Sequence, residues 1–128
     1  MRRLFRLEHL EIVLCDCISS LQQQDAGRIV ITGAHGGMST ALHALGVPAG
    51  LYVFNDAGIG KDAAGVAALR LLNDAGTPAI TVAHASARIG EAEDALANGV
   101  ISQCNRAAHA LGLRAGQTMQ DALALLVG

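Results

Sequence analysis

The sequence predicts an α/β fold: a single three-layer domain with a mostly parallel sheet of about four or five strands and helices on both faces (Rossmann-like). Short apolar runs of strand length alternate with segments of helical periodicity, and short loops join them. The runs are continuously apolar, which is typical of strands covered on both faces. The chain has 128 residues, of which 52% are hydrophobic and 16% charged, so we expect one domain over residues 1–128.

Four apolar runs are candidate strands. The first, Leu10–Cys15, is rich in β-branched and aliphatic residues, and the link after it is close to the minimum of about a dozen residues for a parallel crossover. A hairpin is the alternative, so the direction of this strand stays open. If it is parallel, Asp16, Cys17 and Ser19 join the edge where the other strands end. The later candidates are 28–32, 51–54 and 79–83, and 100–101 is either a short edge strand or a turn.

Capping residues set the predicted helix boundaries. Ser39 or Thr40 can N-cap a helix that ends before Gly46. The clearest amphipathic pattern begins at Lys61 or Asp62 and continues to about residue 75. The remaining predicted helices are 91–98 with an acidic start, 103–111 behind a Ser102 cap, and a last helix through 127 that the pair Thr118 and Asp121 opens as a capping box.

Composition excludes several classes of partner. The formal net charge is -2 and aromatic residues are 2% of the chain, which disfavours nucleic-acid binding. The apolar stretches are too short to span a membrane. Basic residues precede an apolar run at the start, as in a signal peptide, but Glu8, His9 and Glu11 interrupt it, and we expect a cytoplasmic protein. A small, Ala-rich, lightly charged domain is expected to form a homo-oligomer.

Cysteine usage agrees with a cytoplasmic location. Cys15, Cys17 and Cys104 are an odd set without a CxxC spacing, so neither a disulfide framework nor a zinc ribbon is indicated. The spacing of Cys15 and Cys17 is that of two residues on one face of a strand, which predicts a buried pair of small side chains.

Three loop segments carry glycine together with histidine or acidic residues: GAHGG (33–37), FNDAGIGKD (54–62) and HASARIG (84–90). With GVISQCN (99–105), they resemble a bacterial family of uncharacterised α/β proteins, over most of the chain from Asp16 onward. The resemblance implies a common fold and a shared site at these loops, and it brings no activity. The family more usually has Ser where this chain has Ala34, so a hydroxyl next to His35 is missing here.

The first loop is suited to binding an anion. Gly33, Gly36 and Gly37 let the backbone approach a ligand, and the following helix start presents free N–H groups to a phosphate or carboxylate. The alternative is a tight turn without a ligand. The spacing is neither GxGxxG nor GxxxxGKS, so NAD and ATP are not supported and the cofactor stays unknown. His35 is a candidate general acid/base, with a surface histidine as the alternative.

The second loop supplies Asn55, Asp56 and Lys61. Asp56 directly follows a strand, where its carboxylate would orient His35 or bind a cation, and Lys61 would neutralise a substrate anion. The alternative reading makes Asp56 a turn former and Lys61 part of a solvated helix start.

The third loop supplies His84, Ser86 and Arg88. Arg88 is suited to bidentate capture of a carboxylate or phosphate. Ser86 would be a nucleophile if a base lay within hydrogen-bond reach, but no GxSxG elbow surrounds it and a turn role is the alternative. Two histidines and Asp56 would make a metal site only if three separate loops converged, and we assign no metal.

Because the carboxyl ends of parallel strands share one edge, these loops predict a single site there. The expected function is a small cytoplasmic enzyme that acts on a small anionic metabolite by hydrolysis, isomerisation or lyase chemistry. The alternatives are a non-catalytic ligand-binding protein and an oligomeric scaffold subunit. The candidate catalytic residues are His35, Asp56, His84 and Ser86, and the candidate ligand-binding residues are Gly33, Gly36, Gly37, Asn55, Lys61 and Arg88.

Overall fold

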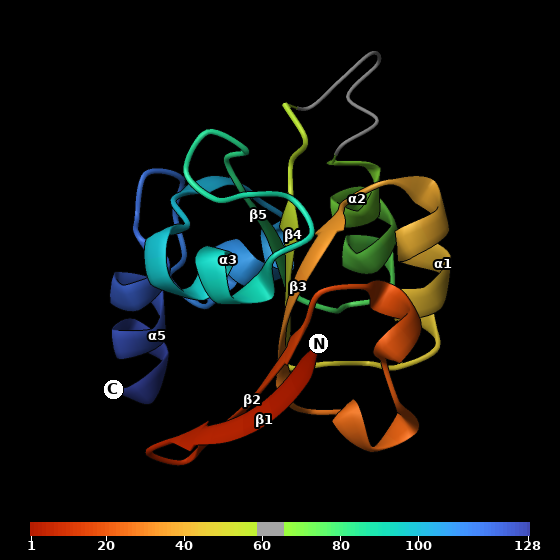
Figure 1. The fold of residues 1–128 in the computed structure, drawn as a ribbon, viewed down its shortest axis with the longest axis horizontal. Coiled ribbons are helices and arrows are strands. Elements are labelled where there is room, and N and C mark those ends of the chain that lie inside the picture. Colours follow the sequence, from red (N-terminus) through yellow and green to blue (C-terminus); the bar gives the residue numbers. More distant parts are fainter. Residues whose placement is uncertain (59–65) are drawn as a thin grey trace.

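One six-stranded mixed sheet forms the centre of the computed structural model, which describes residues 1–58 and 66–128 (Figure 1). The strands lie in the order in which they occur in the chain, and β2 to β5 run parallel while β1 and β6 run antiparallel at the two edges. The predicted α/β class with a mostly parallel sheet is confirmed. The strands are β1 (Arg2–Leu7), β2 (Leu10–Cys15), β3 (Ile29–His35), β4 (Leu51–Asn55), β5 (Ala79–Val82) and β6 (Ile101–Cys104).

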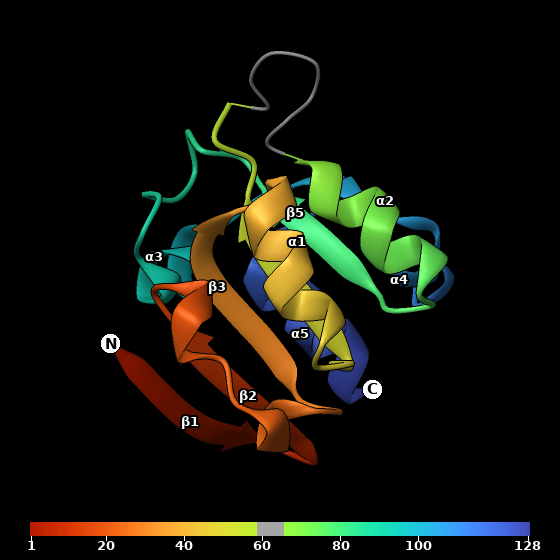
Figure 2. The same ribbon diagram turned by 90° about the vertical axis from the view of Figure 1, so that its right-hand side faces the viewer.

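Helices lie on both faces of the sheet. Figure 2 shows α1 and α2 in front of the strands and α5 behind them. Alanine side chains of α1 and α2 pack on Val30 and Tyr52, whereas α3 and α5 pack on Ile31 and Val53, the neighbours of those two residues along the same strands. Successive residues along a strand therefore pack into the hydrophobic cores on opposite faces of the sheet. The helices are α1 (Met38–Leu45), α2 (Ala67–Asp74), α3 (Ala92–Asn98), α4 (Arg106–Ala110) and α5 (Met119–Val127), and short 3-10 turns are η1 (Ile18–Ser20) and η2 (Gln23–Asp25).

The first predicted strand is β2, and it is parallel to β3, so the hairpin alternative is wrong. The two 3-10 turns complete the crossover between them. The sheet has one more strand than expected because β1 precedes β2 as an antiparallel edge strand. Its arginine-rich sequence carries no apolar run, and ion pairs hold it. Arg2 makes two hydrogen bonds to the fully buried Asp25, at 2.7 and 2.8 Å, and Arg28 adds a third at 2.9 Å.

The segment after Gly99 differs most from the prediction. Residues 101–104 form strand β6, so Ser102 is not a helix cap, and α4 covers 106–110 only. Its N-cap is Asn105, whose buried side chain accepts from Ala108 N at 2.9 Å and from Ala79 N at 3.1 Å. Because the same amide also donates to two carbonyl groups, Asn105 ties the helix start to neighbouring elements and ends the strand.

Other helix starts are partly as predicted. Thr118 caps α5 by accepting a hydrogen bond from Asp121 N at 3.1 Å. Helix α1 begins directly after Gly37, so neither Ser39 nor Thr40 is its N-cap. The predicted helix start at Lys61 or Asp62 lies outside the described residues. No helix within 1–58 or 66–128 is long and apolar enough to cross a membrane.

The predicted buried cysteine pair is wrong. Cys15 is buried as the last residue of β2, but Cys17 lies beyond the strand and is exposed. Strand alternation therefore does not reach it. Both thiols are free, as is that of Cys104.

Candidate functional site

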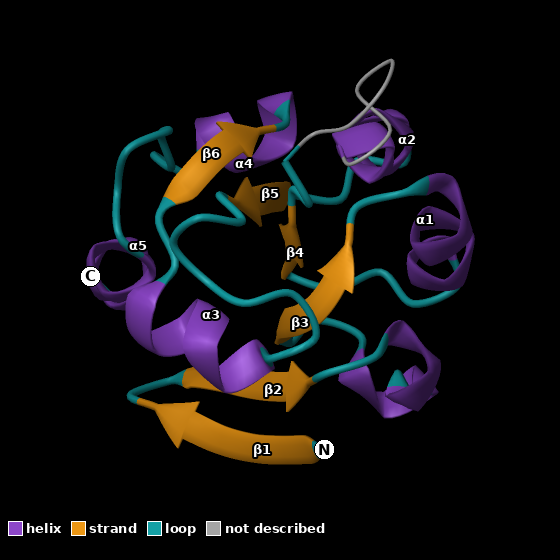
Figure 3. Ribbon diagram, turned by 45° about the horizontal axis from the view of Figure 1, so that its top comes forward, coloured by secondary structure: helices purple, strands orange, loops and turns teal. Residues whose placement is uncertain are grey.

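The site is set by the way the chain leaves two neighbouring strands. After β4 it passes to α2 on one face of the sheet, and after β5 it passes to α3 on the other face (Figure 3). Connections that leave adjacent parallel strands toward opposite faces open a crevice at the carboxyl ends of those strands. Asp56 follows β4 and His84 follows β5 shortly after its end, so both residues lie at this place.

Asp56 links the second and third loops. Its carboxylate is 4% exposed, and Oδ1 accepts hydrogen bonds from Gly58 N at 2.8 Å and from His84 N at 3.0 Å. Burial disfavours the charged carboxylate, but the Ser102 hydroxyl, the two N–H donors and the nearby His84 together outweigh burial and hold the pKa of Asp56 below its ordinary value. Asp56 is therefore an anion at neutral pH.

The imidazole of His84 projects into solvent above this carboxylate. Its side chain is 61% exposed, and its Nδ1 lies 3.6 Å from Asp56 Oδ1. That distance is longer than a hydrogen bond and fits an ion pair when the ring is protonated. The ring also lies against Gly58, where an added Cβ would stand 3.4 Å from His84 Cε1. A buried carboxylate and a close backbone therefore hold one side of the ring, and the other side faces solvent.

A cavity of about 520 Å³ adjoins His84. Arg88 and Asp94 are its charged lining residues among the described residues, and Ser86 and Ile89 also line it. The guanidinium of Arg88 is exposed and lies 3.4 Å from a Glu91 carboxylate oxygen, while its backbone N–H donates to Asp94 at 2.7 Å. The third loop thus presents a cation and an imidazole to the same cavity.

Two of the predicted site residues use their polar atoms to hold the third loop. The amide of Asn55 donates to Ala87 O at 2.9 Å and accepts from Ala57 N at 2.8 Å. The hydroxyl of Ser86 donates to Ala83 O at 2.7 Å and accepts from Val100 N at 2.9 Å. All of these partners are backbone groups, so no base among residues 1–58 and 66–128 is hydrogen-bonded to Ser86, and the contacts favour its turn role.

The three glycines of the first loop have backbone and packing roles. A Cβ on Gly33 would stand 2.5 Å from Glu91 N, and its carbonyl accepts from Gly90 N at 2.7 Å. The N–H of Gly36 donates to Asn55 O at 3.1 Å, and Gly37 is the N-cap of α1. Gly33 therefore lets the third loop cross the end of β3, and the Gly36 N–H is already occupied.

His35 is the exposed last residue of β3 and lies opposite Asn55 in the sheet register. Ala34 packs on the α1 and α2 side, so strand alternation directs His35 toward the side of the third loop. In the part of the chain that the structure describes, no hydrogen bond or ion pair joins it to Asp56, and no group of three His, Cys, Asp or Glu residues is arranged to hold a metal ion. Lys61 lies outside the described residues.

Three acidic or polar residues with roles at this edge were not among the predicted site residues. The Ser102 hydroxyl helps to lower the pKa of Asp56, and Asp94 lines the cavity. Asp16 caps α3, since its Oδ1 accepts from Ala92 N at 2.9 Å. Only Asp16 had a signal in the sequence, because a parallel β2 places it at this edge. Ser102 reaches the site on β6, and Asp94 reaches it on α3, the helix that directly follows the third loop.

Comparison of the chain with known protein families, with curated proteins and with solved structures finds no match. The resemblance of the loops to a bacterial family therefore stays a prediction. The site rests on its own geometry.

Proposed function

We propose that this protein is a small cytoplasmic enzyme that performs general acid–base chemistry on a small anionic metabolite at the carboxyl edge of its sheet. The observation that carries the proposal is the buried, ionised Asp56 beside the exposed ring of His84. A carboxylate near one ring nitrogen favours a proton on that nitrogen and leaves the other free to exchange a proton with a substrate. The Nδ1 of His84 faces Asp56, so its Nε2 is the atom that would react.

The surrounding residues have distinct roles in this proposal. His84 is the catalytic acid/base, and Asp56 is a positioning residue that binds the His84 backbone N–H and lies 3.6 Å from Nδ1 of the ring. Arg88, in the same cavity, would bind the anionic group of the substrate. His35, on the neighbouring strand, is the second candidate for proton transfer. Ser86 and Asn55 would act by holding the third loop.

A three-layer, Rossmann-like arrangement supports placing the site at this edge. In that arrangement α1 and α2 form one outer layer and α3 and α5 form the other, so the crevice opens between the loops that serve the two layers. The cavity of about 520 Å³ is in the range of small-molecule sites.

The proposal is tested with a panel of small carboxylated and phosphorylated metabolites, followed by proton NMR in heavy water for binding and turnover. We expect one chemical class to shift the amides of residues 84–89 and to be converted or deuterated. His84→Gln should slow that reaction about 100-fold or more while binding persists, and Arg88→Ala should weaken binding. His35→Gln is the matched comparison and should have the smaller effect on the rate. Full turnover by His84→Gln would overturn the acid–base role, and binding without turnover by the wild-type protein would favour a ligand sensor.

A second candidate function, an oligomeric scaffold subunit, is favoured by one face of α1. Met38, Leu42 and Leu45 are 50%, 63% and 40% exposed and follow one another at helical spacing. Helix α1 contains no Asp, Glu, Lys or Arg, so its surface offers no fixed charge to pair with a partner of opposite charge. We therefore propose that a second copy of this chain covers the stripe.

A further inference from the structure

We propose that the groove between α2 and β6 is a second binding site, whose ligand is an elongated dianion with an apolar middle, of the aliphatic dicarboxylate class. The groove has a volume of about 550 Å³ and is separate from the cavity beside His84. Its charged lining residues in the described ranges 1–58 and 66–128 are Arg70 on α2 and Arg106 at the start of α4. No acidic side chain of those ranges lines it.

The groove offers hydrogen-bond donors more than acceptors. Asn105 Oδ1 already accepts hydrogen bonds from two backbone N–H groups. The Asn105 side-chain NH2 donates to Leu69 O at 3.1 Å and to Thr77 O at 2.9 Å. Asn73 accepts from Ala107 N at 3.0 Å, which leaves its amide nitrogen as a donor. The two arginines form no salt bridge with a carboxylate that the structure describes. Unpaired guanidinium groups with amide donors are suited to carboxylate or phosphate oxygens.

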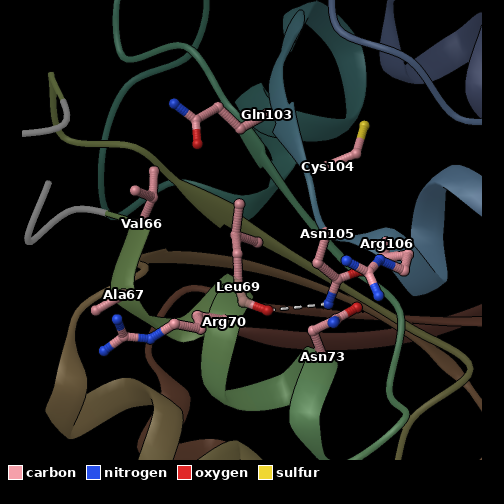
Figure 4. Close-up of a pocket in the computed structure, with 9 residues that line it drawn as sticks. All are labelled: Val66, Ala67, Leu69, Arg70, Asn73, Gln103, Cys104, Asn105 and Arg106. Carbon is pink, nitrogen blue, oxygen red and sulfur yellow. Dashed lines mark hydrogen bonds between the residues drawn. The ribbon is translucent and has the colours of Figure 1, made fainter.

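The two arginines come from different elements, and the half-buried Val66 and Cys104 supply the apolar surface of the groove. Figure 4 shows Arg70 and Arg106 on either side of Leu69, with Val66 and Cys104 along the groove. A single small anion would contact one guanidinium and leave the other without a partner. An anionic group at each end of a short methylene chain would satisfy both arginines and cover the apolar centre.

The groove is better suited to a small molecule than to an added peptide strand. Its volume falls within the range of small-ligand sites. The outer side of β6 is already occupied where the strand begins, because Ile101 N donates to Gln117 O and Ile101 O accepts from Gly116 N, both at 2.8 Å. Strand addition along β6 would need these bonds to open.

The test is a titration of the ¹⁵N-labelled full chain with succinate, adipate and suberate, and with hexanoate as a singly charged comparison. We expect saturable shifts at the amides of Leu69, Arg70 and Cys104, with affinity that depends on chain length. Arg70→Ala and Arg106→Ala should each weaken the best dicarboxylate about tenfold, whereas hexanoate should be sensitive to only one of them.

Arg6→Ala removes the same charge from the exposed strand β1 and should leave the affinity unchanged. His84→Gln should also leave it unchanged, so failure of this proposal is distinguishable from failure of the proposed enzyme activity. The absence of saturable shifts in the groove with any of the three dicarboxylates would overturn the proposal. Equal weakening by Arg6→Ala would overturn it too, because the binding would then reflect overall charge.

Discussion

The carboxylate of Asp56 accepts a hydrogen bond from the backbone N–H of His84 at 3.0 Å and lies 3.6 Å from Nδ1 of the same residue's ring. One buried anion therefore fixes both the main chain and the side chain of the proposed acid/base. This double contact makes Asp56 important for stability as well as for the proposed reaction.

Asp56→Asn should lower the free energy of unfolding by about 2 kcal/mol at pH 7, because a charged acceptor of two backbone N–H donors is replaced by a neutral one. Burial disfavours the charged form, but the nearby Ser102 hydroxyl and the N–H groups of Gly58 and His84 hold the pKa of Asp56 below its ordinary value. Its stabilisation is therefore complete above the unfolded pKa of about 3.9 and is lost as pH falls through the lower folded value.

Urea unfolding of wild type and Asp56→Asn across this pH range measures the difference. The difference in free energy of unfolding between the two proteins should become smaller as the pH falls. Asp74→Asn, at an exposed position on α2, is the control and should change little. A gap that stays constant from neutral pH to about pH 2 would show that the charge of Asp56 does not contribute.

Asp25→Asn should destabilise the protein by about 3 kcal/mol, because it leaves two partly buried arginines without their shared carboxylate. Burial again opposes ionisation, but Arg2, the Gln22 N–H and Arg28 hold the pKa of Asp25 below its ordinary value, so this stabilisation too is lost on acidification. Glu93→Gln, which breaks the exposed pair with Arg3, should cost about 0.5 kcal/mol or less. Chemical denaturation measures the free energy of unfolding of both variants. An equally small decrease in the two would contradict a dominant role for the buried cluster around Asp25.

Gly33→Ala should destabilise the protein by about 2 kcal/mol, because the new Cβ would stand 2.5 Å from two backbone atoms of the third loop. Gly46→Ala is the matched control. Its φ is -77° and the nearest atom to an added Cβ is 3.6 Å away, so we expect a gain of about 0.5 kcal/mol. Thermal unfolding separates the outcomes. A neutral Gly33→Ala variant would mean that the loop moves without cost.

Leu42→Glu should dissociate the oligomer that we propose for α1, because it places a charge in the middle of the exposed apolar stripe. Sedimentation velocity at micromolar concentration compares it with wild type. Leu125→Glu, at a leucine of α5 that is 46% exposed, is the control and should keep the wild-type mass. If the wild-type protein sediments as a monomer, the proposed interface is wrong.

Most of the parallel centre of the sheet could be predicted from its residues. Strands β2 to β5 are continuous apolar runs, and such runs keep their character wherever they lie in the fold. The edge strands had a weaker signal: residues 100–101 gave a short edge strand as one alternative, which β6 confirms in part, and β1 was not predicted. β1 is half arginine and is held by Asp25, which lies far along the chain. β6 is joined to β5 by a hydrogen bond of 2.8 Å between the hydroxyl groups of Ser102 and Thr81. Pairing partners of this kind are absent from any local pattern.

The class of fold, the loops that end the parallel strands and the presence of His84, Asp56 and Arg88 in those loops could all be predicted from the sequence, because hydrophobic periodicity and loop composition are local properties. The meeting of Asp56 with His84 depends instead on the packing of the whole chain, as does the use of Ser86, Asn55 and Gly33 to hold the third loop. Within the described residues, no hydrogen bond or ion pair joins His35 to Asp56 or His84. This is because the loop after β5 leads to the face of the sheet opposite to that reached after β4, and it crosses the end of β3. That crossing determines which polar groups of the loops are buried and hydrogen-bonded.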